Sequence, residues 1–197
     1  MKSIRQITAT AALGLTLSLA APLTAQAQST EGEATEGLSM GQTLVDGRVV
    51  GEEYVGDTFQ DWAHRCVTTA DGTDPCNAYQ LLVDSEGNSV AEISLVPISN
   101  GGQAVAGGTI VTPLETLLLQ QVTLRIDAGA ERRYPFSFCT RQGCISRVGF
   151  TQADIDAMKR GAGATLSIVP AGAPDQPVVL DVSLTGFTAA YDALAPR

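Results

Sequence analysis

The chain has 197 residues and a formal net charge of −9 at pH 7. This length is enough for one domain with a hydrophobic core. The acidic balance argues against nucleic acid as a partner, because an acidic surface repels the phosphate backbone, and the chain contains no nucleic-acid-binding motif.

Residues 1–27 have the three parts of a secretory signal peptide. Lys2 and Arg5 supply the positive start, an apolar run covers residues 9–21, and Ala25-Gln26-Ala27 gives a cleavage site with small residues. The run is shorter than the roughly 20 apolar residues that span a bilayer, so we expect cleavage and not a retained anchor. The mature chain would begin at Gln28 with 10 basic against 21 acidic residues, which gives a net charge of −11.

Residues 28–56 are rich in Glu, Gly, Thr and Ser and contain few apolar side chains. A segment of this composition cannot bury much surface, so we expect a flexible acidic lead. A calcium site is the alternative use of its acids, but they lack the alternating spacing around a central glycine that such a loop has. The expected domain therefore covers residues 57–197.

After Trp62 the pattern becomes that of β-strands. Residues 79–83 and 90–97 flank a turn-rich link, which predicts a hairpin. A glycine-rich loop is expected at residues 100–108. Pro135 cannot donate to a β-ladder, so the strand that contains it should lie at an edge or carry a bulge. Further strand regions are expected at residues 117–126, 134–138, 164–169 and 178–184.

One helix is signalled clearly near residue 151. Thr151 can cap it, Asp154 occupies the reciprocal position three residues later, and Gly161 can end it. A second short helix is expected over residues 188–194. Short strands at regular spacing with one or two small helices predict an all-β domain, an antiparallel β-sandwich or barrel-like fold.

The four cysteines form two close pairs, Cys66 with Cys76 and Cys139 with Cys144. Thiols of exported proteins become oxidised, and both intervening loops are short and rich in turn residues, so we expect these two disulfides. Structural zinc prefers shorter gaps than the nine residues that separate the first pair. A bonded Cys66 leaves His64, the sole histidine, with no thiol to activate. The sequence thus predicts no catalytic residue, metal or cofactor.

Five arginines gather around the second cysteine pair: Arg125, Arg132, Arg133, Arg141 and Arg147. Only two acids lie among them, inside an otherwise acidic chain. Two interpretations stay open: dispersed charges that solubilise a sheet, or a basic patch for anionic glycans, lipid head groups, an acidic protein or the acidic lead itself. Trp62, the sole tryptophan, is a further candidate binding residue, although a tryptophan beside a disulfide is most often part of the core.

Several short blocks together give a family resemblance. They are Asp61-Trp62-x-x-x-Cys66, Cys76-x-x-x-Gln80, Pro135-Phe136-x-x-Cys139-x-x-x-Gly143-Cys144 and Leu184-x-Gly186-Phe187. Their order and spacing resemble the invasion-associated locus B family of α-proteobacterial exported proteins, over residues 57–194. The resemblance implies an all-β exported domain of the cell envelope, associated with host-cell invasion in intracellular pathogens. It supplies no catalytic residues.

The sequence as a whole predicts a disulfide-stapled β-sandwich that is located in the periplasm. Association with the outer membrane and secretion are the alternative locations. It would act as a binding or accessory protein, with an envelope component, an anionic glycan or lipid, or a protein as partner. Neither nucleic acid nor an integral membrane segment of the mature chain is expected. Two alternatives stay open: a secreted virulence factor that contacts host surfaces, and a hydrolase built on two carboxylates.

Overall fold

The structure, a computed structural model, describes residues 39–99 and 102–194. Contacts divide the chain into Met1–Met40 and a compact unit, Gly41–Arg197, to which every element below belongs. The signal peptide predicted for residues 1–27 lies outside the described residues. The described strands are β1 (Leu44–Val45), β2 (Arg48–Val49), β3 (Glu53–Phe59), β4 (Trp62–Val67), β5 (Cys76–Val83), β6 (Ser89–Pro97), β7 (Ala106–Thr112), β8 (Val122–Ile126), β9 (Arg132–Tyr134), β10 (Phe136–Thr140), β11 (Gly143–Phe150), β12 (Gly163–Ile168) and β13 (Val178–Ser183). The described helices are η1 (Leu118–Gln120), α1 (Gln152–Arg160) and α2 (Phe187–Leu194).

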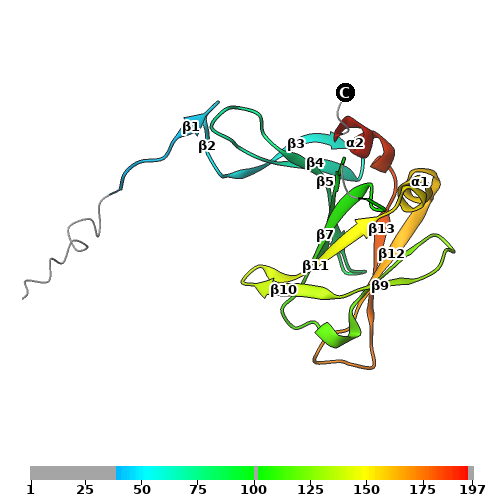
Figure 1. Cartoon of the computed structure of the whole chain (residues 1–197). Helices are drawn as coiled ribbons and strands as arrows, with labels where there is room; N and C mark the ends of the chain where they lie inside the picture. The colour runs from blue at the N-terminus through cyan, green and yellow to red at the C-terminus, as the bar shows by residue number, and fades with distance from the viewer. Residues whose placement is uncertain (1–38, 100–101, 195–197) are drawn as a thin grey trace, which may run out of the picture. The chain divides into compact units, whose positions relative to one another are not determined.

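Two antiparallel sheets make up the compact unit (Figure 1). The larger sheet has seven strands in the order β10-β11-β7-β6-β5-β4-β3, and the smaller has four in the order β13-β12-β8-β9. Strands β1 and β2 form a separate two-stranded ribbon. The predicted all-β antiparallel sandwich is confirmed. In the part of the chain that the structure describes, the sheets stay open and do not close into a barrel.

The core lies between the inner faces of the two sheets. In β4 the side chains of Trp62, His64 and Cys66 are buried and the residues between them are half-buried, as the two-residue period of a strand requires. The smaller sheet contributes Leu124 from β8 and Leu166 from β12, which lie opposite each other in the ladder. Removal of these apolar side chains from water is the main force that holds the sheets together.

The predicted hairpin is present. Strands β5 and β6 pair in antiparallel register, with Leu82 opposite Ala91. The carboxylate of Asp84 closes the turn by accepting hydrogen bonds from the backbone N–H groups of Glu86 and Asn88. The side chain of Asn88 donates to the same carboxylate and lowers the pKa of Asp84. Turn residues of this kind satisfy nearby backbone N–H groups, and for this reason the sequence pattern predicted the hairpin correctly.

The chain passes from the smaller sheet to the larger one through Pro135, which lies between β9 and β10. Strand β10 is an edge strand, and its pairing with β11 shifts between Phe136 and Phe138. The strand expected over residues 134–138 is therefore interrupted at Pro135, which belongs to neither strand. The expected edge position is confirmed for the strands on both sides of the proline, since β9 and β10 are each the last strand of a sheet.

Both predicted helices are present. Thr151 accepts a hydrogen bond from the backbone N–H of Asp154, and the Asp154 carboxylate accepts one from the backbone N–H of Thr151, which completes the capping box of α1. Gly161 is the C-terminal cap. Helix α2 packs across strands β3 to β6 and buries Phe187 and Tyr191. None of the helices within the described residues is long and apolar enough to cross a membrane.

Two regions differ from the sequence-based expectations in their boundaries. The expected loop at residues 100–108 ends early, because β7 begins at Ala106. Gly108 belongs to this strand for a packing reason: a Cβ atom there would lie 2.6 Å from the ring of Phe150. The expected strand at 117–126 divides into η1 and β8 at Gln121, whose φ angle is +61°, a conformation that ends regular structure.

Part of the expected flexible lead, residues 28–56, is built into strands. Strands β1 and β2 and the first half of β3 lie within it, and Glu53 pairs with Val67 across the β3–β4 ladder. Gly56 lets the backbone of β3 approach the first disulfide, since a Cβ atom there would lie 3.3 Å from Sγ of Cys66. Composition did not predict these strands because strand formation here depends on pairing, of β1 with β2 and of β3 with the later strand β4.

Candidate functional site

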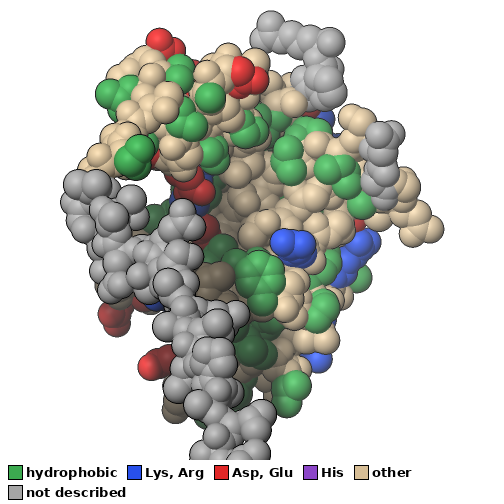
Figure 2. Space-filling view, turned by 60° about the vertical axis from the view of Figure 1, so that its left-hand side comes forward, with side chains coloured by type: hydrophobic (Ala, Val, Ile, Leu, Met, Phe, Trp, Pro, Cys, Tyr) green, Lys and Arg blue, Asp and Glu red, His purple; other side chains and the backbone are tan. Residues whose placement is uncertain are grey.

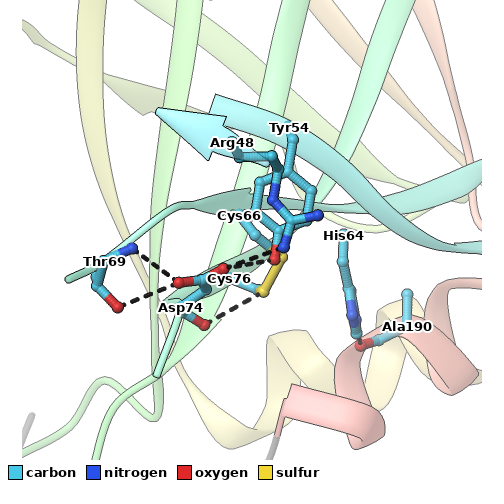
Figure 3. The surroundings of a disulfide bond; sticks show 8 residues. All are labelled: Arg48, Tyr54, His64, Cys66, Thr69, Asp74, Cys76 and Ala190. Carbon is cyan, nitrogen blue, oxygen red and sulfur yellow. Dashed lines mark hydrogen bonds and ion pairs between the residues drawn. A yellow bond between two sulfur atoms is a disulfide. The ribbon is translucent and has the colours of Figure 1, made fainter. Parts of the chain in front are cut away.

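The first disulfide joins residues that face each other on adjacent strands. Cys66 of β4 lies opposite Cys76 of β5, as predicted (Figure 3). The carboxylate of Asp74 organises the loop between them, and its Oδ1 accepts a hydrogen bond from the backbone N–H of Thr69 at 2.8 Å. Its other oxygen, Oδ2, accepts a hydrogen bond from the hydroxyl of Tyr54 at 2.8 Å. Asp74 therefore fastens the disulfide loop to β3.

Charge and hydrogen bonding around this loop shift three pKa values. The backbone N–H of Thr69 and the hydroxyl of Tyr54 lower the pKa of Asp74. The same bond to Asp74 raises the pKa of Tyr54. The side chains of Thr69 and Thr73 lower the pKa of Asp71 to about 2. Hydrogen bonds to a carboxylate favour its charged form, so this loop holds two ionised acids at neutral pH.

Arg48 of β2 adds a cation beside the same loop. Its Nη2 lies 3.7 Å from Oδ2 of Asp74, and its guanidinium lies 4.0 Å from the centre of the Tyr54 ring. Figure 3 shows the arginine and the tyrosine side by side next to the disulfide. These contacts stabilise the local structure and leave no open position for a ligand at the Asp74 carboxylate.

The second disulfide, Cys139–Cys144, likewise joins opposite residues, on β10 and β11. The sequential connectivity is thus the one that the structure contains, and all four cysteines are bonded. Disulfide sulfurs cannot serve as zinc thiolates or as a nucleophile. His64 has a structural contact as well: its Nε2 lies 2.8 Å from the carbonyl oxygen of Ala190 on α2, and its ring is buried.

Trp62 does not belong to a binding surface, and this corrects its place among the candidate binding residues. Only 1% of the residue is exposed. Its ring packs edge-on against Phe187 of α2, with 5.1 Å between the ring centres. A tryptophan this deeply buried packs in the core and offers no face to a partner.

The structure divides the five candidate arginines into two groups. Arg125 pairs with Glu131, at 3.6 Å between Nη1 and Oε1. Arg132 donates from Nη1 to Oδ2 of the buried Asp154 at 2.8 Å. Since that carboxylate also caps α1, Arg132 links β9 to the start of the helix. These two arginines therefore form ion pairs within the fold. The patch without such ion pairs has fewer than the five arginines that the sequence suggested.

The second group is Arg133, Arg141 and Arg147, which we call the arginine surface. All three are exposed, and none of them belongs to an ion pair among the described residues. Arg133 is the middle residue of β9, the strand before Pro135, and Arg141 follows the edge strand β10. The guanidinium of Arg147 lies 5.5 Å from the ring centre of Phe138, within the range of a cation–π contact.

Apolar side chains lie beside the arginine surface, and sequence reasoning missed them. Leu118 and Leu119 of η1 border a hollow of about 320 Å³ together with Phe138. The exposed fractions of these three residues are 43%, 98% and 45%. The signal available in the sequence was the run Leu117-Leu118-Leu119 followed by two glutamines, which interrupts the alternation of a strand. Figure 2 shows hydrophobic side chains next to Lys and Arg on one face of the molecule.

Two carboxylates that the hydrolase alternative could use are bound within the fold. Asp154 is buried, and its carboxylate accepts hydrogen bonds from Thr151 and Arg132. Glu92, beside a hollow of about 710 Å³ on the larger sheet, is bound to Arg65 at 3.1 Å. Within the described ranges no cluster of three or more His, Cys, Asp or Glu side chains could hold a metal ion.

Known proteins resemble this chain in sequence. A family model described as invasion associated locus B (IalB) protein matches residues 62–195. The chain belongs to the invasion-associated locus B family. The expected resemblance is thereby confirmed, and the matched residues contain both disulfides and the arginine surface.

Individual members of the invasion-associated locus B family give a consistent picture. Invasion protein B homologs from two strains of Brucella abortus, 2308 and biovar 1 strain 9-941, are each 29% identical over 144 residues. These matches cover 73% of this chain and 81% of each relative. The crystal structure of invasion associated protein B from Bartonella henselae superposes with a TM-score of 0.60 at 26% identity, and the match covers 72% of this chain and 94% of that chain.

Proposed function

We propose that this protein is an exported binding protein of the cell envelope, located in the periplasm, that contacts anionic envelope material through the arginine surface and catalyses no reaction. Two disulfides support export, because disulfides persist in oxidising compartments. Membership of the invasion-associated locus B family supports a role in the envelope or in invasion.

The charge distribution carries this proposal. The chain has a net charge of −9, yet residues 132–153 contain four arginines and no acid. Three of these arginines form the exposed arginine surface, whereas the fourth, Arg132, is bound to Asp154. Arginine recognises phosphate and carboxylate groups through paired N–H donors, so an unpaired set on an acidic protein is suited to an anionic partner.

The test compares retention of variants on an envelope extract. We expect the double variant Arg133→Glu with Arg141→Glu to lose retention, because both side chains are exposed and reversal of their charge repels an anionic partner. Arg160→Glu on α1 is the matched control, since Arg160 is exposed but lies outside the arginine surface. Equal retention of the double variant and the wild type, with equal melting temperatures, contradicts the proposal.

A secreted protein that contacts host surfaces is the second candidate function. The observation that favours it is that the relatives from Brucella abortus and Bartonella henselae are named as invasion proteins. Fractionation separates the two candidates: accumulation in the culture medium supports contact with host cells, and retention in the periplasm supports the envelope role.

A further inference from the structure

The turn at η1 projects two leucines from the surface. Leu119 is 98% exposed and Leu118 is 43% exposed. Single exposed apolar residues are normal on soluble proteins. Here, however, the two leucines share the rim of one hollow with Phe136 and Phe138 of the neighbouring edge strand. The apolar side chains therefore form one continuous exposed group, which is typical of a contact site.

Position within the fold keeps this turn exposed. The backbone N–H of Leu117 donates to the carbonyl oxygen of Val169, and Thr116 forms an isolated bridge with Pro170, so the residues just before η1 are fixed. At the other end, Gln121 leads directly into Val122 of β8. The leucines thus project from a turn that is anchored on both sides.

One cation contacts this apolar group directly, and two more lie close to it along the chain. Arg147 lies against Phe138, while Arg133 and Arg141 lie before and after the edge strand. These two arginines are eight positions apart along the chain, so they are at most about 26 Å apart at the rise of an extended strand. The nearest acids along the chain are Glu115 and Glu131, and Glu131 is paired with Arg125.

We propose that this surface docks onto an anionic phospholipid bilayer, with Leu118 and Leu119 entering the boundary between head groups and acyl chains and the arginine surface binding lipid phosphates. This inference rests on the proposed function, because it names the partner of the same arginines. Apolar side chains that enter the interface and cations that bind anionic head groups are the two contributions that hold peripheral proteins on membranes.

Charge complementarity selects a lipid surface and its orientation. An acidic protein is repelled by an anionic membrane unless a basic surface, here the one built from the acid-free segment 132–153, faces the lipid. At a salt concentration of about 0.1 M, charges more than about 10 Å away are largely screened, so the arginines in contact outweigh the distant acids. A glycan would use the arginines but would not require two projecting leucines. A protein partner could use both, and the vesicle experiment below distinguishes it from a bilayer.

Sedimentation with vesicles tests the proposal on the mature chain. We expect binding to vesicles of phosphatidylcholine with phosphatidylglycerol and little binding to phosphatidylcholine alone. Replacement of one arginine by glutamine should weaken binding about fivefold. Leu118→Ser with Leu119→Ser should weaken it about tenfold or more, because the apolar insertion is lost. Val179→Ser on β13 is the matched control, since Val179 is also exposed and apolar but lies at the edge of the smaller sheet opposite to β9.

A fluorescent variant measures insertion directly. The natural Trp62 is buried, so its emission should not respond to lipid. We expect Leu119→Trp to shift its emission to the blue on anionic vesicles and to be quenched by brominated acyl chains. Absence of both effects overturns the insertion, even if the serine variants fail to fold.

The outcomes separate this inference from the proposed function. Loss of binding to anionic vesicles in both the leucine and the arginine variants supports the bilayer as partner. If the wild type is retained by envelope extract through its arginines but ignores anionic vesicles, the proposed function stands and the bilayer inference is wrong. If the wild type is retained by neither material, both are wrong.

Discussion

The indole N–H of Trp62 donates a hydrogen bond to the carbonyl oxygen of Ser183 at 2.7 Å, and this bond ties the larger sheet to the last strand of the smaller one. Gln80 strengthens the same joint, because its Oε1 accepts from the backbone N–H of Ser183 and its Nε2 donates to the carbonyl. Asp61 accepts a hydrogen bond from the hydroxyl of Ser183. Residues that carry the family resemblance thus join the two sheets.

Trp62→Phe should lower the free energy of unfolding by about 2 kcal/mol, since it removes a buried hydrogen bond and some core volume. Gln80→Leu should act on the same joint, so the two changes together should not be additive. Urea denaturation of the single and double variants measures this. Additive effects, or a Trp62→Phe protein as stable as the wild type, contradict the assigned role.

Removal of the first disulfide should cost more than removal of the second. The cysteines are separated by 10 and 5 positions, and closure of loops of these lengths stabilises a protein by about 2.7 and about 2.1 kcal/mol on the chain-entropy model. We expect Cys66→Ala with Cys76→Ala to be the less stable pair, because the Asp74 contacts are weakened as well. Chemical denaturation in oxidising buffer gives both values, and the reverse order would argue against this view of the loop.

Acid should loosen the first disulfide loop. The pKa values of Asp71 and Asp74 lie below the ordinary value of 3.8 in the folded protein. Their contribution to stability is therefore present above that value and is lost as the pH falls toward 2. Melting temperatures measured from pH 5 downward should fall less steeply for Asp74→Asn than for the wild type. The exposed Asp57→Asn serves as the control, and parallel curves for all three proteins contradict the prediction.

Arg132 and Arg133 are neighbours with different roles, and glutamine variants should separate these roles. Arg132→Gln should lower stability, by at most about 1 kcal/mol because the arginine is half exposed, and should leave retention on envelope extract intact. Arg133→Gln should weaken retention without a change in melting temperature. Thermal melts and retention assays on both proteins provide the comparison, and an identical outcome for the two variants would reject the division of the arginines.

Gly186→Ala should prevent stable folding. Gly186 has a φ angle of +87°, and a Cβ atom there would lie 1.8 Å from the carbonyl oxygen of Phe59. We expect a loss of more than about 3 kcal/mol, since both backbone strain and overlap oppose the substitution. Gly172→Ala, with nothing within 4 Å of the added atom, is the control. Expression of a Gly186→Ala protein with wild-type stability would show that the close approach is not needed.

Features that depend on neighbours in the sequence were predictable. The capping box at Thr151, the turn at Asp84 and the short disulfide loops each involve residues a few positions apart. The edge position of Pro135 followed from its missing N–H. Strands β1 to β3 escaped prediction because their acidic, glycine-containing segment forms strands only through pairing: β1 pairs with β2, and β3 pairs with β4. The exposure of Leu119 also depends on how η1 is anchored, which composition does not reveal.

The sequence by itself determined the cysteine pairs, the all-β class and the family, since each follows from local chemistry or from a linear pattern. Only the tertiary structure decided which arginines are available for binding. Arg132 meets Asp154 from 22 positions away, and Trp62 meets Ser183 from 121 positions away. Such long-range contacts form only when the two sheets pack together. Burial and ion pairing of these residues therefore cannot be read from their order in the sequence.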